Sequence, residues 1–252
     1  NSPVSVGAVD LLASTISISI SDPRRGTKRF GTPGFDSQVR EGPAVGRISI
    51  SYYLTNTNGL IRSLFGGVIS EATVTVGEYR LFGAVANSLS MTIEPYSVVS
   101  CTLEMSFYDG YDQDGSEGTL STPADVIHGG ASEVSSDLLW GNDIVSCQYT
   151  LSHSVEPVYP FGELIPTGYT RDGGSVEITL AGTGLGHIID YSTVCEGYTS
   201  GVITLAGLCP STDPYDPVIG GDIPFSEYVI NPEITVAPNE EINGSLTVFG
   251  VL

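Results

Sequence analysis

Two stretches of alternating apolar and polar residues, far apart in the chain, share one plan. Residues 87–107, NSLSMTIEPYSVVSCTLEMSF, and residues 231–249, NPEITVAPNEEINGSLTVF, each hold an alternating run that ends at a proline and a second run around a leucine. The prolines are Pro95 and Pro238, and the leucines are Leu103 and Leu246. Because alternation is typical of a half-buried strand and proline rarely continues one, each stretch predicts strand, turn, strand.

Further landmarks upstream of each stretch recur in the same order. An alternating strand follows Arg40 and Arg171. The offset between matched residues is 127 at Asp10, 131 at Phe30 and Arg40, 128 at Ile48 and 143 at Pro95. This order predicts a tandem duplication with loop insertions in the second copy. Alternatively, two β-rich segments share alternation and prolines without common origin. The matches are Asp10-Leu11-Leu12 with Asp137-Leu138-Leu139, Phe30-Gly31 with Phe161-Gly162, Arg40 with Arg171, and Ile48, Ile50 and Tyr52 with Val176, Ile178 and Leu180.

The composition favours short strands joined by tight turns. The chain of 252 residues contains 31 Gly and 15 Pro, and helix-period patterns are scarce. We therefore expect an all-β protein of two tandem β-sandwich-like or barrel-like domains with little helix, including one short helix from Ser136 to Trp140. The expected boundaries are a first domain at 1–120, a linker at 121–134, and a second domain at 135–252 with an insertion at 207–225.

The charge is strongly negative and unevenly distributed. The net charge is −20, yet six of the nine basic residues and only four of the 29 acidic residues precede residue 48. The first 47 residues thus carry +2 and the remainder −22. A body this acidic repels phosphate, which argues against specific or wrapping nucleic-acid binding.

The basic residues gather in a long segment at 22–47 that is rich in glycine and proline. A loop of this length is unusual inside a compact domain, so it is either a solvated insertion or an arm that contacts the acidic body of a neighbouring copy. A second candidate contact is the apolar tip at 56–67, which exposes its leucines and phenylalanine unless it docks. The candidate subunit contacts are Arg24, Arg25, Lys28, Arg29, Arg40, Arg47, Leu64 and Phe65.

No motif in the chain supports catalysis or a cofactor. The acidic turn at 109–118 offers Asp109, Asp112, Asp114 and Glu117, but their spacing is not that of the twelve-residue calcium loop, so a solvated turn is favoured over a calcium site. The glycine run at 182–186 lacks the spacing of a dinucleotide loop. The three histidines have no metal-binding spacing. They are His128, His153 and His187, each expected at the surface or hydrogen-bonded.

The four cysteines are too few for a disulfide scaffold. Cys101 and Cys147 fall in strand-like runs, which predicts small buried apolar side chains. Cys195 and Cys209 flank a glycine-rich hairpin candidate, and the sequence leaves open whether they are bridged.

The segment at 146–182, SCQYTLSHSVEPVYPFGELIPTGYTRDGGSVEITLAG, resembles bacteriophage tail tube proteins. The resemblance lies in an alternating strand, an aromatic-Gly-x-x-x-Pro corner, a glycine turn and another alternating strand. The strand-Pro-strand segment at 87–107 is similar to theirs as well. Together the two quoted segments comprise 58 of the 252 residues.

The resemblance implies a β-sandwich whose inner strands join those of neighbouring subunits into a barrel. Duplicated members of that family form trimeric rings with pseudo-sixfold symmetry, and the stacked rings conduct DNA during ejection. It also implies a virion structural protein of the tail, assembled in the host cytoplasm, that partners itself and other tail proteins and binds no cofactor or specific DNA sequence. Two alternatives stay open, namely another virion part such as a capsid decoration or tail-end protein, and a carbohydrate-binding β-sandwich of an adhesin.

Overall fold

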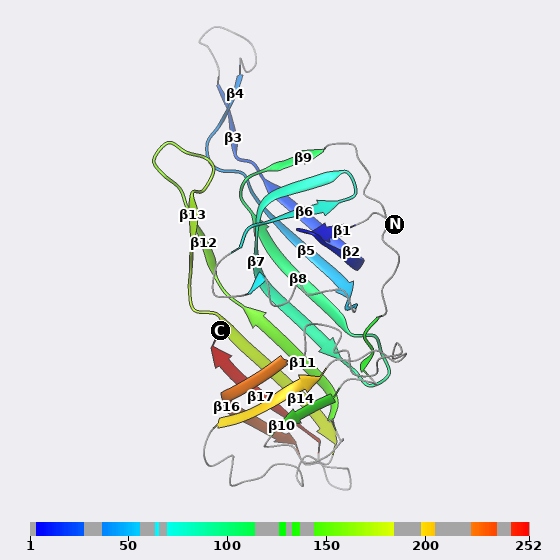
Figure 1. Ribbon diagram of the computed structural model, residues 1–252. Coiled ribbons are helices and arrows are strands. Elements are labelled where there is room, and N and C mark those ends of the chain that lie inside the picture. The colour runs from blue at the N-terminus through cyan, green and yellow to red at the C-terminus, as the bar shows by residue number, and fades with distance from the viewer. Residues whose placement is uncertain are drawn as a thin grey trace.

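The computed structural model is built from strands and turns (Figure 1). It describes residues 4–27, 37–55, 64–65, 70–113, 126–129, 133–136, 144–183, 198–204, 223–235 and 243–251. The expected all-β class is confirmed. The strands are β1 (Val4–Val6), β2 (Val9–Ser21), β3 (Arg24–Thr27), β4 (Ser37–Arg40), β5 (Val45–Tyr53), β6 (Ala72–Val76), β7 (Tyr79–Ile93), β8 (Ser100–Phe107), β9 (Tyr111–Gln113), β10 (Glu133–Ser136), β11 (Ile144–Ser152), β12 (Val155–Val158), β13 (Gly168–Arg171), β14 (Ser175–Thr183), β15 (Tyr198–Thr204), β16 (Ile223–Thr235) and β17 (Asn243–Val251).

The first half of the chain forms a closed barrel of six strands in the order β7-β6-β1-β2-β5-β8. The barrel closes because β7 pairs with β6 along one edge and with β8 along the other. Each of the six strands therefore has a neighbour on both sides, although β1 covers only the first residues of β2.

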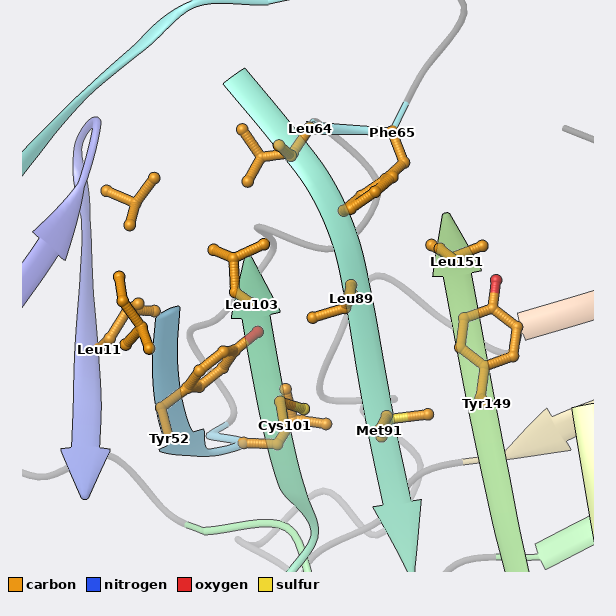
Figure 2. Packing of buried hydrophobic residues seen from close by; sticks show 14 of the residues in the cluster. Leu11, Tyr52, Leu64, Phe65, Leu89, Met91, Cys101, Leu103, Tyr149 and Leu151 are labelled. Atoms are coloured by element: carbon orange, nitrogen blue, oxygen red, sulfur yellow. The ribbon is translucent and has the colours of Figure 1, made fainter. Parts of the chain in front are cut away.

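The alternating pattern of the sequence places the core inside this barrel. Ile48, Ile50 and Tyr52 of β5 are almost fully buried, and the residues between them on the strand face outward. Figure 2 shows Leu103 of β8 and Leu89 of β7 among the core side chains. Fully burying one such aliphatic side chain contributes about 1.5–3 kcal/mol, so the period-two pattern is sufficient to select the inner face.

Strand β7 also joins the barrel to the second half of the chain. Its first residues pair with β6, from Tyr79 to Ala84, and its last residues pair with β11, from Ser88 to Ile93, along the same edge. The sheet continues from β11 through β14, β17, β16 and β15 to β10. Thirteen strands therefore form one continuous sheet, and its part from the second half of the chain is open over the described residues.

The two halves share one order of strand pairing. The first half runs β2-β5-β8-β7-β6, and the second runs β11-β14-β17-β16-β15. The registers also correspond, because the pairs Ile18↔Ile48 and Ile50↔Leu103 become Tyr149↔Ile178 and Leu180↔Leu246 when residue numbers are shifted by 131 for β2, 130 for β5 and 143 for β8. The sequence match of Leu103 with Leu246 agrees with this register, whereas the match of Ile48 with Val176 is two residues out.

A two-stranded hairpin projects between the first two long strands of each half (Figure 1). Strands β3 and β4 lie between β2 and β5, and strands β12 and β13 lie between β11 and β14. The base of each hairpin is closed by one backbone hydrogen bond at matching positions, from Glu41 N to Pro23 O at 2.9 Å and from Asp172 N to Ser154 O at 3.1 Å. We name these hairpins the first arm (residues 22–44) and the second arm (residues 153–174).

Three expectations from the sequence need correction or limitation. The segment at 22–47 is not a plain loop, because its ends pair as β3 and β4 and its last residues belong to β5. Part of the expected linker at 121–134 belongs to the barrel, since Ile127 is fully buried and its N–H donates to the Leu54 carbonyl oxygen. Ser136 ends strand β10, and residues 137–140 of the expected helix lie outside the described residues. Of the expected insertion at 207–225, residues 207–222 also lie outside them, and the last three residues begin β16.

Gly46 of β5 occupies a position that admits no side chain. A Cβ atom built there would lie within the ring of Phe107, which is itself 1% exposed and cannot move aside. We therefore expect Gly46→Ala to reduce the free energy of unfolding by about 1–3 kcal/mol, measured by urea denaturation. Adding Phe107→Leu should recover part of the loss. Gly173→Ala, where nothing lies near the new Cβ, is the control and should change stability by less than about 0.5 kcal/mol.

Candidate assembly surface

The expected basic contacts do not form one surface. Arg24 and Arg25 lie on the first arm and are paired within it, Arg24 Nη2 with Asp22 Oδ2 at 2.6 Å and Arg25 Nη1 with Glu41 Oε1 at 3.4 Å. Such exposed ion pairs contribute at most about 1 kcal/mol each, so they orient the arm more than they stabilise it. Arg40 ends β4 opposite Arg24, whereas Arg47 lies on β5 outside the arm. Lys28 and Arg29 lie outside the described residues.

Leu64 and Phe65 are core residues, which corrects the expectation that they are exposed contacts. They are 8% and 5% exposed, and the Phe65 ring lies 5.1 Å from the His153 ring, centroid to centroid. Figure 2 shows both side chains directed at the core beside β7. Leu64 and Phe65 thus pack onto their own chain, and packing of this kind over a long sequence distance carries no local sequence signal.

The outer face of the continuous sheet carries rows of hydroxyl groups from β2 to β14. Two hydroxyl contacts link neighbouring strands, Ser51 Oγ with Thr102 Oγ1 at 3.3 Å and Ser152 Oγ with Ser175 Oγ at 2.8 Å. Cross-strand contacts of this kind pin the register of adjacent strands. One transverse row pairs Ser17, Ser49, Glu104, Ser88, Ser152 and Ser175 in turn, and the next pairs Thr15, Ser51, Thr102, Ser90, Thr150 and Glu177.

We call this surface the hydroxyl face. It spans both halves of the chain without interruption, because β7 and β11 are paired. Its described charges include the exposed carboxylates Glu104 and Glu177 and the guanidinium of Arg47. A face this poor in cations offers a polyanion little charge to bind, and its hydroxyl groups keep it wet. On this face the negative net charge of the chain therefore appears as a scarcity of cations and not as a dense layer of acidic side chains.

The long strand β2 has one edge that is only partly paired. Its residues from Val9 to Leu11 pair with β1, and no described strand pairs with that edge from Leu12 to Ser21. The opposite edge of β2 pairs with β5 as far as Ser21. Among the described residues, this stretch of ten therefore leaves unpaired the half of its backbone donors and acceptors that point away from β5, and we call it the β2 edge.

Strand β16 has a similar open segment at the opposite end of the sheet. Its residues from Ile223 to Val229 pair with β15, and those from Val229 to Thr235 pair with β17 on the other side. No described strand pairs with the β15-side edge from Ile230 to Thr235. We call this segment the β16 edge. In the first half of the chain, the corresponding segment of β7 is the one that β11 occupies.

His153 is buried at the base of the second arm and lines a recess of about 560 Å³ on the hydroxyl face, together with Ser49 and Glu104. Its Nε2 lies 2.6 Å from the Ala86 carbonyl oxygen and so carries the donated proton, and its Nδ1 has no partner among the described residues. Burial lowers the pKa of His153, the Ala86 carbonyl opposes that shift, and Arg171 adds to it. The histidine expected at the surface or hydrogen-bonded is thus hydrogen-bonded and buried.

The depressed pKa of His153 predicts a loss of stability in acid. Because the folded state favours the neutral ring, neutral His153 contributes fully to the free energy of unfolding above its unfolded-state pKa of about 6.5. This contribution is lost as the pH falls through the lower pKa of His153 in the folded state. We expect the free energy of unfolding to fall between pH 7.5 and pH 5. The free energy of unfolding of the His153→Gln variant should fall less over the same range. Urea denaturation at both pH values checks this, and equal slopes would contradict it.

The remaining candidate residues are described only in part. Cys101 and Cys147 are free and buried, as the alternating pattern predicts, and burial raises the pKa of each thiol to about 12. Asp109 and Asp112 lie around β9, whereas Asp114, Glu117, Cys195 and Cys209 lie outside the described residues. The described residues contain no cluster of three or more ligating side chains placed for a metal ion. Within the described part of the chain, no helix is long and apolar enough to cross a membrane.

Sequence reasoning missed the two open edges, which are the most distinctive features of the assembly surface. Alternation locates strands but not which strand lies beside which, so neither edge could be read from it. A search for known relatives adds no identity, since no family model and no curated protein matches the chain.

Proposed function

We propose that this chain is a virion structural protein that assembles into stacked rings, forming the tube of a phage tail through which DNA is ejected. One observation carries the proposal: the sheet runs through eight strands, β2-β5-β8-β7-β11-β14-β17-β16, with a hydroxyl face from β2 to β14 and, over the described residues, an open edge at each end. Such an element supplies a wall segment whose two margins are ready to continue into neighbours.

The shared strand order supports a duplicated origin for this wall. Both halves carry the same five-strand pairing order, the same register relations and an arm at the same place. The hairpin loops agree too, because the pairs Thr92↔Ser100 and Thr235↔Asn243 each enclose seven residues. We propose that each chain contributes two like units, so that three chains form one ring of pseudo-sixfold symmetry.

The surface charge suits a conduit for a polyanion. With a net charge of −20 and few cations on the hydroxyl face, the wall would let DNA pass without holding it. Strong phosphate binding would arrest the polymer, since each retained contact must be broken before it can move.

Electron microscopy of concentrated protein tests the proposed function. We expect hollow rings and short stacks from the purified chain, because a wall segment with two open edges is satisfied only in a closed assembly. A decoration protein would stay unpolymerised under the same conditions. Calcium-dependent retention on immobilised glycans, with no rings at any concentration, would instead support the adhesin.

We further propose that the first arm contributes to the stacking of rings. Its cations would face the acidic body of the chain in the next ring, and such exposed contacts weaken with salt. We expect replacement of Arg24, Arg25, Lys28 and Arg29 by Ser to shorten stacks while leaving single rings intact. Stack lengths in micrographs provide the measurement, with Arg80→Ser as the control for loss of an exposed cation. Unchanged stacks would rule out this role.

A further inference from the structure

We propose that the β16 edge of one chain pairs antiparallel with the β2 edge of a second copy, in the register that joins β7 to β11 within each chain. This inference rests on the proposed ring assembly and specifies its joint. The partner is a second copy of this chain because each chain carries both sides of the joint, one at each end of its sheet.

The joint between β7 and β11 is the template. It comprises six paired positions, from Cys147↔Ile93 to Ser152↔Ser88. On its apolar side, Tyr149 and Leu151 are 6% and 3% exposed, and Figure 2 shows them on β11 beside β7. The template thus combines a backbone ladder with burial of the apolar residues of the added strand.

The β2 edge corresponds to the side of β11 that the template covers. The register shift of 131 residues matches Ile18 to Tyr149 and Ile20 to Leu151. Ile20 is 42% exposed and Ile18 is half-buried, whereas their counterparts on β11 are buried. The difference has a direct cause, since β11 has a strand beside it and this part of β2 has none among the described residues.

The β16 edge corresponds to the segment of β7 that covers β11. The shift of 143 residues matches Ser88 to Asn231 and Thr92 to Thr235. Both segments begin where a shorter strand, β6 or β15, stops pairing. Pro232 stands where β7 has Leu89, so the joint has at most one donor fewer than the template. Proline is tolerated on edge strands, which agrees with an edge that is completed only on assembly.

Applying both shifts to the template gives the register of the joint between chains. Isoleucines face apolar residues and serines face polar ones, so the core side and the hydroxyl face both continue across it. The contact is heterologous, because β2 and β16 are different surfaces, and repetition of it closes a ring or extends a filament. The expected pairs are Ser17↔Thr235, Ile18↔Ile234, Ser19↔Glu233, Ile20↔Pro232 and Ser21↔Asn231.

Disulfide trapping tests the joint. The double variant Ser19→Cys with Glu233→Cys, oxidised at assembly concentration, should give a ladder of covalent multimers on a non-reducing gel. The single variants control for the native cysteines. Ser19→Cys with Asn231→Cys is the register control, because diagonal positions about 7–8 Å apart are too distant for a strain-free disulfide. Ser90→Cys with Thr150→Cys reproduces the template pair and should cross-link within one chain only.

The outcomes separate the joint from the proposed function. Rings in micrographs without interchain cross-links from Ser19→Cys with Glu233→Cys, or with cross-links in the register control instead, would overturn the joint and leave the tube proposal standing. Cross-links without rings would support the joint and count against the tube, and absence of both would overturn both. Should that double variant fail to fold, as judged by circular dichroism, Ser17→Cys with Thr235→Cys applies the same test.

Discussion

Replacement of Ile20 by lysine is expected to abolish ring assembly while leaving the single chain folded. Ile20 is 42% exposed in the chain, so the lysine stays solvated and stability should change by less than about 0.5 kcal/mol. In a ring its environment would match that of Leu151, which is 3% exposed. An unpaired buried charge costs about 3–5 kcal/mol, which raises the concentration needed for assembly at least about 100-fold.

Tyr79→Lys is the matched control for this prediction. Tyr79 is 43% exposed, carries an apolar ring and lies on β7 at a point paired with β6 and β9. It receives the same charge at the same exposure, away from both open edges. Mass photometry over a concentration series measures the assembly. Equal loss of assembly in both variants would attribute the effect to charge alone, and full assembly of the Ile20→Lys chain would contradict the role of the β2 edge.

Reversing the carboxylates of the hydroxyl face is expected to make assembled rings hold DNA. Glu104 and Glu177 are exposed on neighbouring rows of this face. With both replaced by arginine, three chains would present six cations to a duplex in the lumen. About six phosphate contacts give an affinity that falls about 10³-fold between 50 mM and 200 mM salt. Retention of a short linear duplex by assembled protein measures this, and the unmodified assembly should retain none.

Glu78→Arg with Glu163→Arg is the control, because it changes the net charge equally. Both residues are exposed, Glu78 in the turn between β6 and β7 and Glu163 at the tip of the second arm. Neither lies in the rows of the hydroxyl face. Equal DNA retention by the two double variants would show that the hydroxyl face has no special access to DNA. No retention by the variant of the hydroxyl face would contradict its placement in the lumen.

The alternating pattern predicted most of the strands because burial on one face selects residues at every second position. Ile48, Ile50 and Tyr52 point into the barrel as expected, and Cys101 and Cys147 are buried within strands. The strand-turn-strand stretches at 87–107 and 231–249 are the paired strands β7 with β8 and β16 with β17. These features depend on local pattern alone, so one sequence suffices to find them.

Features that depend on contacts between distant residues could not be predicted in this way. The pairing of β7 with β11, which merges the halves into one sheet, adds no local signal to either strand. Strands β3 and β4 of the first arm were not predicted, because the glycine, proline and arginine residues there are atypical of strands. The contact of Phe65 with His153 links residues far apart in the chain, so Leu64 and Phe65, which the sequence predicts as exposed, are in fact buried.

A reconstruction of assembled protein by electron cryo-microscopy tests the central claim most directly. The proposed function predicts a hollow ring lined by one uninterrupted sheet, in which β16 of each chain lies beside β2 of the next at the spacing of paired strands, about 4.8 Å. A ring whose chains touch through other surfaces, with the β2 and β16 edges left open or covered by their own chain, would contradict it.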